Sequence, residues 1–470
     1  MPGGMRMLIR KHYFCAHYIL YMEIFIKLSQ FLLSLSLLII LHELGHFIPA
    51  KLFKTRVEKF YLFFDVKFSL FKKKIGETVY GIGWLPLGGY VKISGMIDES
   101  MDKEQMAQPP QPWEFRSKPA WQRLIIMLGG VTVNFILAFL IYIGMAYAYG
   151  DFYLNNDQIR DGVWITSDVV EKAGIKTGDK ILAIDGEKLT RFDASINGKL
   201  LTAQNATIER DGQQQTVTFP KNFIGKYVDA AEKSHLVTLR MPFVVGGADE
   251  SSANKDVLQK KDILTSIGGQ PVKYIDQATA YLEAHKGQTV SATVLRNEQP
   301  TDVTLKISSE GKLGVALGAL TEENLAKMGY YNFSREDYGF LESIPVGLEK
   351  GKNQLVGYGK QLKMIFNPST GAYKGVGGFK AIFDIFPKSW SWEAFWGITA
   401  ILSIMLGVMN LLPIPALDGG HVMFLLYEMI TRRKPSDKFM EHAQLVGFVL
   451  LIGLLLFANG NDIYKAIAGK

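Results

Sequence analysis

Two histidines and a glutamate stand in a spacing that can hold and use a metal ion. The segment His42-Glu43-Leu44-Gly45-His46 places its histidines four residues apart. In a helix this spacing puts both side chains on one face, one turn apart. Two neutral imidazoles so placed can share a tetrahedral zinc ion. Glu43 lies too far round the helix to be an easy third ligand, but it can take a proton from an activated water. This pattern is the zinc helix of metalloproteases.

The same segment could be a solvated surface helix with incidental histidines. The sequence context opposes that interpretation, because the apolar run Leu37-Leu38-Ile39-Ile40-Leu41 directly precedes the motif. Ionisable side chains within reach of a membrane are costly unless they have a partner or a function. We therefore predict that His42 and His46 bind zinc.

The expected third ligand is Asp418, which stands among apolar residues and needs a partner there. Pro413 and Pro415 precede it and interrupt helical hydrogen bonding, which is tolerated at this depth beside a wet cavity. His421 is an alternative ligand or, more simply, a structural group. Asn410 could hydrogen-bond a substrate backbone or a developing oxyanion, or could serve only helix packing.

The composition restricts the remaining possibilities. The chain has 470 residues, of which 48% are hydrophobic and 21% charged, and it carries a net charge of +7. Apolar segments mixed with soluble stretches are indicated. No lysine- or arginine-rich run lies among aromatic residues, so we expect no nucleic-acid partner. The single cysteine, Cys15, excludes both an internal disulfide and a cysteine-based zinc site.

The hydropathy pattern predicts a polytopic α-helical membrane protein with four transmembrane helices, because about 20 apolar residues are needed to cross a bilayer. The expected segments are an N-terminal extension at 1–21, the first transmembrane helix with the zinc motif at 22–50, a cytoplasmic or membrane-associated β region at 51–121, the second helix at 122–149, two PDZ-like domains at 150–225 and 226–312, a linker with an amphipathic segment at 313–392, the third helix with the aspartate ligand at 393–430, a cytoplasmic loop at 431–442, and the fourth helix with the C-terminus at 443–470.

Basic residues near the span ends predict the orientation. Many lysines and arginines lie between the first two spans, and Arg432, Arg433, Lys434 and Lys438 lie between the last two. Both loops should therefore be cytoplasmic, and the segment 150–392 should face the other side. Basic residues before Met22 argue the other way, an objection that disappears if Met22 is the true start.

The long insert contains two copies of one pattern, at 169–186 and 257–272. Each copy has a turn ending in aspartate, an apolar strand and a glycine turn. The pattern resembles PDZ domains of bacterial envelope proteases, which bind an extended chain at a sheet edge. The alternative is a pair of small β-rich spacers that screen substrates by bulk alone.

Two further elements are expected beside the spans. Residues 79–93 are rich in β-branched and aromatic residues broken by glycines, and they predict a membrane-associated β-hairpin. Residues 344–366 predict an amphipathic helix on the membrane surface. In the second span, Gly129-Gly130-Val131-Thr132-Val133-Asn134 predicts close helix packing.

These motifs together resemble the site-2 protease family of intramembrane zinc proteases, in its bacterial form with tandem PDZ domains, over most of the chain from Met22 onward. The resemblance implies that His42, His46 and Asp418 are zinc ligands and that Glu43 is the general base. One departure is Gly375-Val376-Gly377-Gly378-Phe379, where relatives often carry a Gly-Pro pair ahead of the third span.

The resemblance also implies a biological setting. The substrates would be single-span membrane proteins cut within their membrane segments, such as an anti-sigma factor or remnant signal peptides. An upstream site-1-type protease would make the first cut, and the PDZ-like domains would bind or screen the product. The β element would pair with the unwound substrate. The location would be a bacterial inner membrane, in a stress response, with the PDZ-like domains on the periplasmic side.

Three alternatives remain open. A membrane-bound zinc protease with soluble substrates would take its third ligand, usually a glutamate, from a soluble helix rather than Asp418 from a span. A membrane-anchored PDZ scaffold or chaperone without catalysis would need no metal, and the intact set of His42, Glu43, His46 and Asp418 argues against it. A metal transporter could also use histidine and aspartate in its spans.

Overall fold

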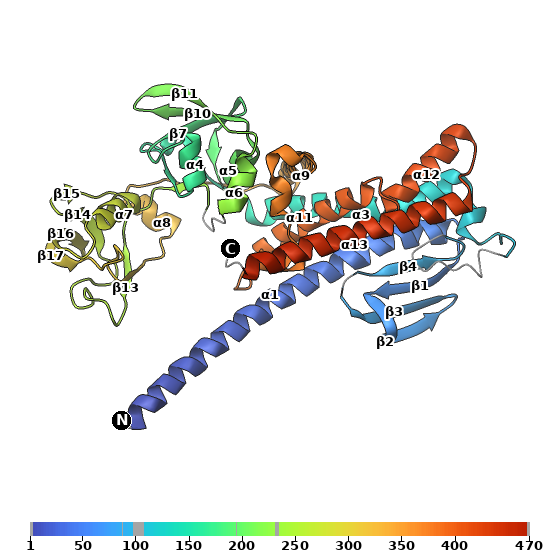
Figure 1. The fold of residues 1–470 in the computed structure, drawn as a ribbon, viewed down its shortest axis with the longest axis horizontal. Helices are drawn as coiled ribbons and strands as arrows, with labels where there is room; N and C mark the ends of the chain where they lie inside the picture. Colours follow the sequence, from blue (N-terminus) through green and yellow to red (C-terminus); the bar gives the residue numbers. More distant parts are fainter. Residues whose placement is uncertain (1–2, 87, 97–107, 194, 231–234, 468–470) are drawn as a thin grey trace. The chain divides into compact units, whose positions relative to one another are not determined.

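The computed structural model describes residues 3–467 except 87, 97–107, 194 and 231–234, and within these it describes the side chains from Tyr21 onward apart from that of Asp437. The chain forms two compact units (Figure 1). One comprises residues 1–150, 337–362 and 376–470, and the other comprises residues 151–336 and 363–375.

Long apolar helices make up most of the first unit. They are α1 (Gly3–Leu52), α3 (Ala120–Tyr149), α11 (Trp392–Leu411) and α13 (Asp437–Ile467). Among the described residues four helical stretches are long and apolar enough to cross a membrane, at Tyr21–Leu52, Ala120–Tyr149, Trp392–Leu411 and Lys438–Ile467. The predicted number of spans is confirmed at this level. The helix α3 lies centrally, in contact with α1, α11 and α12 (Asp418–Thr431).

The segment 393–430, expected as the third span with its helical hydrogen bonding interrupted at Pro413 and Pro415, forms two helices. The helix α11 ends at Leu411, and α12 begins at Asp418. Pro413 and Pro415 lack the backbone N–H that a continuous helix needs, and Ala416 has a φ of 84°, outside the helical region. The break places Asp418 in the first turn of a new helix.

A four-stranded sheet follows α1. Its strands are β1 (Val57–Leu62), β2 (Phe64–Ile75), β3 (Thr78–Leu85) and β4 (Tyr90–Ile93), in the order β2-β3-β1-β4. The hairpin expected at 79–93 is wrong, because β1 lies between β3 and β4 and pairs parallel with one and antiparallel with the other. The tight hairpin is instead β2–β3, turning at Gly76 with φ 60°. The β pattern located the strands but could not show which of them pair.

Two shorter helices complete this unit. The predicted amphipathic helix forms as α9 (Phe340–Ile365), and a Cβ on its Gly347 would collide with the backbone of Ile143 in α3. The helix α10 (Phe379–Asp384) follows the glycine-rich segment. Its first turn is held by Asp462 of α13, which accepts hydrogen bonds from the backbone N–H groups of Gly378 (2.9 Å) and Ala381 (3.2 Å). A side chain of α13 thus anchors the glycine-rich segment at the start of α10.

The second unit, drawn in green and yellow in Figure 1, contains two modules, each with its own core. The first module consists of residues 151–239 and 320–336. Its elements are β5 (Asp151–Asn155), η2 (Asn156–Gln158), β6 (Val163–Ile165), α4 (Asp168–Ala173), β7 (Lys180–Ile184), β8 (Glu187–Lys188), β9 (Arg191–Phe192), α5 (Ser195–Thr202), β10 (Asn205–Arg210), β11 (Gln213–Thr218), α6 (Phe223–Ala230), β12 (Val237–Leu239), α8 (Glu322–Lys327) and β19 (Ser334–Glu336). The short turns η3 (Pro368–Thr370) and η4 (Ala372–Gly375) pack on α6.

The second module consists of residues 243–317. Its elements are β13 (Val245–Ala248), β14 (Ile263–Ile267), β15 (Gln270–Pro271), α7 (Ile275–Ala284), β16 (Thr289–Arg296), β17 (Gln299–Lys306) and β18 (Val315–Leu317). The sheets β11-β10-β7-β8 and β17-β16-β14-β15 have the same strand order, and in both a helix connects the second and third strands along the chain. The two copies seen in the sequence therefore share one fold.

The boundary between the modules differs from the sequence estimate. Residues after 226 still belong to the first module, because β12 pairs with β6 and Leu236 and Val237 lie in the first core. After the second module the chain returns, and β19 pairs with β5 while Leu325 joins the same core. The second module is thus an insertion between parts of the first. Local patterns cannot reveal such pairing between distant strands.

Candidate metal centre

The histidine pair faces inward from α1. His42 and His46 are both buried, and their Nε2 atoms lie 3.3 Å apart. The segment folds as a continuous helix through the motif, so the four-residue spacing puts both rings on one face. Gly45, between them, leaves room for α3: a Cβ there would lie 2.4 Å from the backbone oxygen of Gly129.

The break between α11 and α12 brings Asp418 to the same point. Its Oδ2 lies 3.4 Å from the Nε2 atoms of both His42 and His46. This oxygen is buried and has no hydrogen-bond partner among the described residues. A buried carboxylate oxygen is favourable only beside a compensating positive charge or donor, so this position fits a bound cation.

The donor atoms have the spacing that zinc requires. Their separations are 3.3, 3.4 and 3.4 Å. Ligand atoms bonded at 2.0–2.1 Å in a tetrahedron lie about 3.3–3.4 Å from one another. Among the residues with described side chains, His42, His46 and Asp418 form the one cluster of histidine, cysteine and carboxylate groups able to hold a metal ion. Two imidazoles and one carboxylate are also the ligand types of catalytic zinc sites, which leave the fourth position open.

The other ring nitrogens of the two histidines both face α3. The Nδ1 of His46 lies 2.9 Å from the backbone oxygen of Ile126. The Nδ1 of His42 lies 3.0 Å from Nδ2 of Asn134. Sequence reasoning assigned α3 only a packing role and missed these contacts. A signal was present, because Asn134 is a polar side chain in an apolar span.

Glu43 and Asn410 flank the cluster. Glu43 lies on the side of the sheet, because a Cβ on Gly89, next to β4, would lie 3.7 Å from its Cγ. Asn410, near the end of α11, has its Nδ2 3.2 Å from Nε2 of His42. Both predicted residues are therefore beside the donor atoms without belonging to the cluster.

His421 lies outside the cluster. Its Nε2 is 3.3 Å from Nε2 of Gln444 in α13, and it belongs to no metal-binding group among the residues described. The structure therefore favours the structural role over the alternative ligand. One turn of α12 separates it from Asp418, which is why the sequence left both possibilities open.

Comparisons with known proteins agree with this chemistry. Residues 30–454 match the model of peptidase family M50. A protein of Thermotoga maritima is 25% identical over 92% of this chain and 98% of its own length. A protein of Fusobacterium nucleatum is 27% identical over 92% of this chain and 96% of its own length. The names of both include the words "Putative zinc metalloprotease".

A structural match is more limited. The PDZ domain of an SdrC-like protein from Listeria monocytogenes is 23% identical to a part covering 17% of this chain, with a TM-score of 0.15. The assignment of the chain depends instead on the match over residues 30–454. The chain belongs to peptidase family M50, the site-2 proteases, and its histidine–histidine–aspartate cluster is consistent with zinc.

Proposed function

We propose that this protein is an intramembrane zinc endopeptidase that hydrolyses peptide bonds within the membrane segments of other proteins. One observation carries the proposal: the donor atoms of His42, His46 and Asp418 meet, buried, between helices apolar enough to cross a membrane. A hydrolytic metal between such helices can act only on a substrate whose peptide bond also lies within the membrane.

Each residue of the site has a distinct task. His42, His46 and Asp418 would hold the metal, which when bound supplies Lewis acidity that activates water and polarises a carbonyl. Glu43 takes the proton of the attacking water and passes it to the leaving amine. Asn410, whose Nδ2 lies 3.2 Å from Nε2 of His42, would donate a hydrogen bond to the substrate backbone or to negative charge developing on the scissile carbonyl.

The sheet supports a way of presenting the substrate. A membrane helix must unwind before its carbonyl groups are accessible, and an extended chain can add to a free strand edge. The strand β4 is an edge of its sheet and begins next to Gly89, beside Glu43. We infer that β4 binds the unwound substrate and orients one peptide bond towards the site.

The setting is part of the same proposal. The substrates are single-span membrane proteins already shortened by another protease, and the two PDZ-like modules bind or screen them. The protein is located in a bacterial inner membrane, with the modules on the periplasmic side, as the basic loops indicate. Anti-sigma factors and remnant signal peptides are the substrate classes to test first.

The first test is the Glu43→Gln variant. We measure cleavage of a single-span model substrate in detergent, together with the zinc content of the protein. Loss of the proton acceptor should lower the rate by about 10²–10⁴-fold without loss of zinc, since Glu43 is not in the donor cluster. The matched control is Glu23→Gln, the same substitution on the same helix, where the glutamate pairs with Lys388; it should keep full activity.

Other outcomes would support the alternatives. If the wild type holds no zinc, or if Glu43→Gln and the wild type cut equally, the catalytic proposal fails and the scaffold interpretation replaces it. If a soluble peptide with the same scissile sequence is cut as fast as the single-span substrate, the protein is a metalloprotease of soluble substrates.

A further inference from the structure

One stripe of α3 contacts both imidazoles of the zinc motif. Ile126, Gly130 and Asn134 are spaced four residues apart and therefore share a face of the helix. The backbone oxygen of Ile126 contacts His46, and the side chain of Asn134 contacts His42. Between them, Gly130 leaves the space that the rings fill, because a Cβ there would lie 2.3 Å from Nε2 of His46.

The ligand geometry determines which ring nitrogens carry hydrogen. The Nε2 atoms point at Asp418 and at each other, so these are the atoms that would bind a metal and must be unprotonated. In a neutral imidazole the other nitrogen is then a donor. For His46 this requirement is met, because Nδ1–H can donate to the carbonyl of Ile126. Such a bond fixes both the tautomer and the orientation of the ring.

His42 requires an acceptor at the corresponding place. The structure places Nδ2 of Asn134 there, at 3.0 Å, while Oδ1 of the same side chain is buried without a partner among the described residues. Two donors facing each other are unfavourable. A half-turn of the amide exchanges its oxygen and nitrogen, and Oδ1 then accepts from Nδ1–H of His42. In either orientation one atom of the Asn134 amide lacks a partner. Only the turned orientation forms a hydrogen bond with Nδ1–H of His42 when the metal is bound.

We propose that Asn134 is a positioning residue: its side-chain oxygen accepts a hydrogen bond from Nδ1 of His42 and so holds Nε2 of that histidine towards the metal. The proposal rests on the zinc site of the proposed function. In this proposal α3 does more than pack against α1. Its backbone carbonyl at Ile126 orients His46, and its Asn134 side chain orients His42.

The test compares Asn134→Leu with Asn134→Asp. Leucine has nearly the same shape but no acceptor, whereas aspartate keeps the acceptor oxygen. In the full-length protein, Asn134→Leu should raise the zinc dissociation constant about 10–100-fold, measured by competition with a chelator, and should alter the visible spectrum of the cobalt-loaded protein. Asn134→Asp should bind zinc within a few-fold of the wild type.

The controls separate this role from packing. Ser403 donates from Oγ to the backbone oxygen of Asn134 at 2.7 Å, so Ser403→Ala disturbs the same helix contact without touching an imidazole, and it should leave zinc affinity unchanged. Thermal unfolding of the chelator-treated variants checks folding. If the leucine variant does not fold, Asn134→Ala replaces it in the comparison, with the same expected loss.

Each outcome is informative. Zinc binding by Asn134→Leu as tight as that of the wild type would overturn the proposal, as would an equal loss in Asn134→Leu and Asn134→Asp. A wild type that binds no zinc would instead overturn the proposed function itself. The two failures are therefore distinguishable in one set of titrations.

Discussion

At the scale of single residues, the site depends as much on a missing side chain as on those present. Gly130 of α3 faces the two imidazoles, and a Cβ there would lie 2.3 Å from Nε2 of His46 and 2.6 Å from Cε1 of His42. Neither imidazole ring can move away from α3 without losing a contact, because the Nδ1 atom of each ring also contacts this helix. The glycine therefore sets the distance between α3 and the ligands.

This predicts a strong effect of a single methyl group. Gly130→Ala should displace both rings and lower zinc affinity at least 10-fold, because ligand positions matter within a few tenths of an ångström. The matched control is Gly144→Ala on the same helix, where a Cβ meets nothing within 4 Å, and it should bind zinc like the wild type. Chelator competition on both variants measures the difference. Equal zinc affinities of the two variants would show that the imidazole rings can shift without loss of the site.

At the scale of elements, the two modules repeat one ion pair, in which the aspartate is buried and the arginine is partly exposed. In the first, Arg210 at the end of β10 binds Asp179 and the carbonyl of Gly174. In the second, Arg296 at the end of β16 binds Asp262 and the carbonyl of Val257. Each aspartate belongs to the turn that the sequence pattern located. The guanidinium ties that turn to the central strand through several directed hydrogen bonds, which lysine could not reproduce.

The second pair predicts a pH dependence. Burial alone would raise the pKa of Asp262, but hydrogen bonds from Arg296 and from the backbone N–H of Gln259 hold that pKa below its ordinary value. The pair thus stabilises the module above the ordinary carboxyl pKa of about 4, and this stabilisation is lost as the pH falls through the lowered folded-state pKa. Asp262→Asn should cost about 1.5–3 kcal/mol at pH 7, the contribution of hydrogen bonds to a charged group, and much less near pH 2.

Hydrogen exchange of the β14 and β16 amides, corrected for intrinsic rates, measures this difference in the full-length protein. The control is Asp302→Asn, an exposed aspartate on the neighbouring strand that accepts from the hydroxyl of Thr293. This control substitution should hardly change the hydrogen exchange of the β14 and β16 amides at either pH. A loss of protection in Asp262→Asn that is the same at pH 7 and near pH 2 would contradict the assigned pair.

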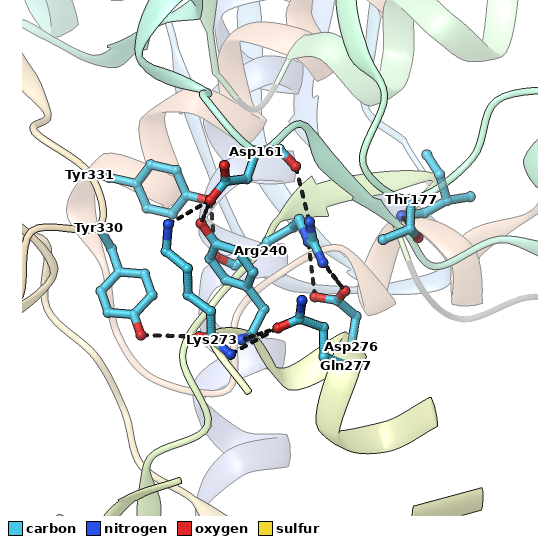
Figure 2. Close-up of polar contacts among 10 residues, drawn as sticks. Asp161, Thr177, Arg240, Lys273, Asp276, Gln277, Tyr330 and Tyr331 are labelled. Carbon is cyan, nitrogen blue, oxygen red and sulfur yellow. Dashed lines mark hydrogen bonds and ion pairs between the residues drawn. The ribbon is translucent and has the colours of Figure 1, made fainter. Parts of the chain in front are cut away.

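At the scale of the whole molecule, a polar junction joins the two modules (Figure 2). Arg240, on the connection between them, pairs with Asp276 of α7 at 2.6 Å and donates to the backbone oxygen of Asp161 at 3.1 Å. Its guanidinium also lies over the ring of Tyr274, which donates to the Asp161 carboxylate. Lys273 binds the same carboxylate at 2.6 Å but is 57% exposed. The junction therefore has one buried and one exposed cation.

The buried cation should control the relative orientation of the modules. Removing Arg240, which is 12% exposed, leaves Asp276 without its partner and costs roughly 3–5 kcal/mol. Removing the exposed Lys273 costs about 0.2–1 kcal/mol. We therefore expect Arg240→Ala to free the modules to move and Lys273→Ala to leave them fixed.

Distances between two spin labels, measured by pulsed electron paramagnetic resonance in the full-length protein, test whether the modules move. Spin labels at the exposed positions Gln213 and Gln299, one on each module, are introduced with Cys15 replaced by serine. The wild type and Lys273→Ala should give a narrow distance distribution, and Arg240→Ala a broad one. A narrow distribution in Arg240→Ala would show that apolar contacts alone fix the modules.

The sequence by itself determined the local chemistry. The four-residue spacing of His42 and His46 predicted a shared metal because helix geometry converts spacing into direction. Apolar runs predicted the helices long enough to span a membrane, and repeated turn patterns predicted the two modules. The shared helix face of the two rings, the long apolar helices and the two modules are found in the structure because each depends on residues close together in the chain.

Only the tertiary structure decided what depends on distant contacts. It brought Asp418 to the histidines across more than 370 residues and put Asn134 against His42. It also placed β1 between β3 and β4, and it returned the chain to the first module after the second. The Arg296 and Arg210 pairs were likewise invisible in the pattern. Such pairings depend on packing between segments that local propensity leaves independent, and they are selected only when the whole core is assembled.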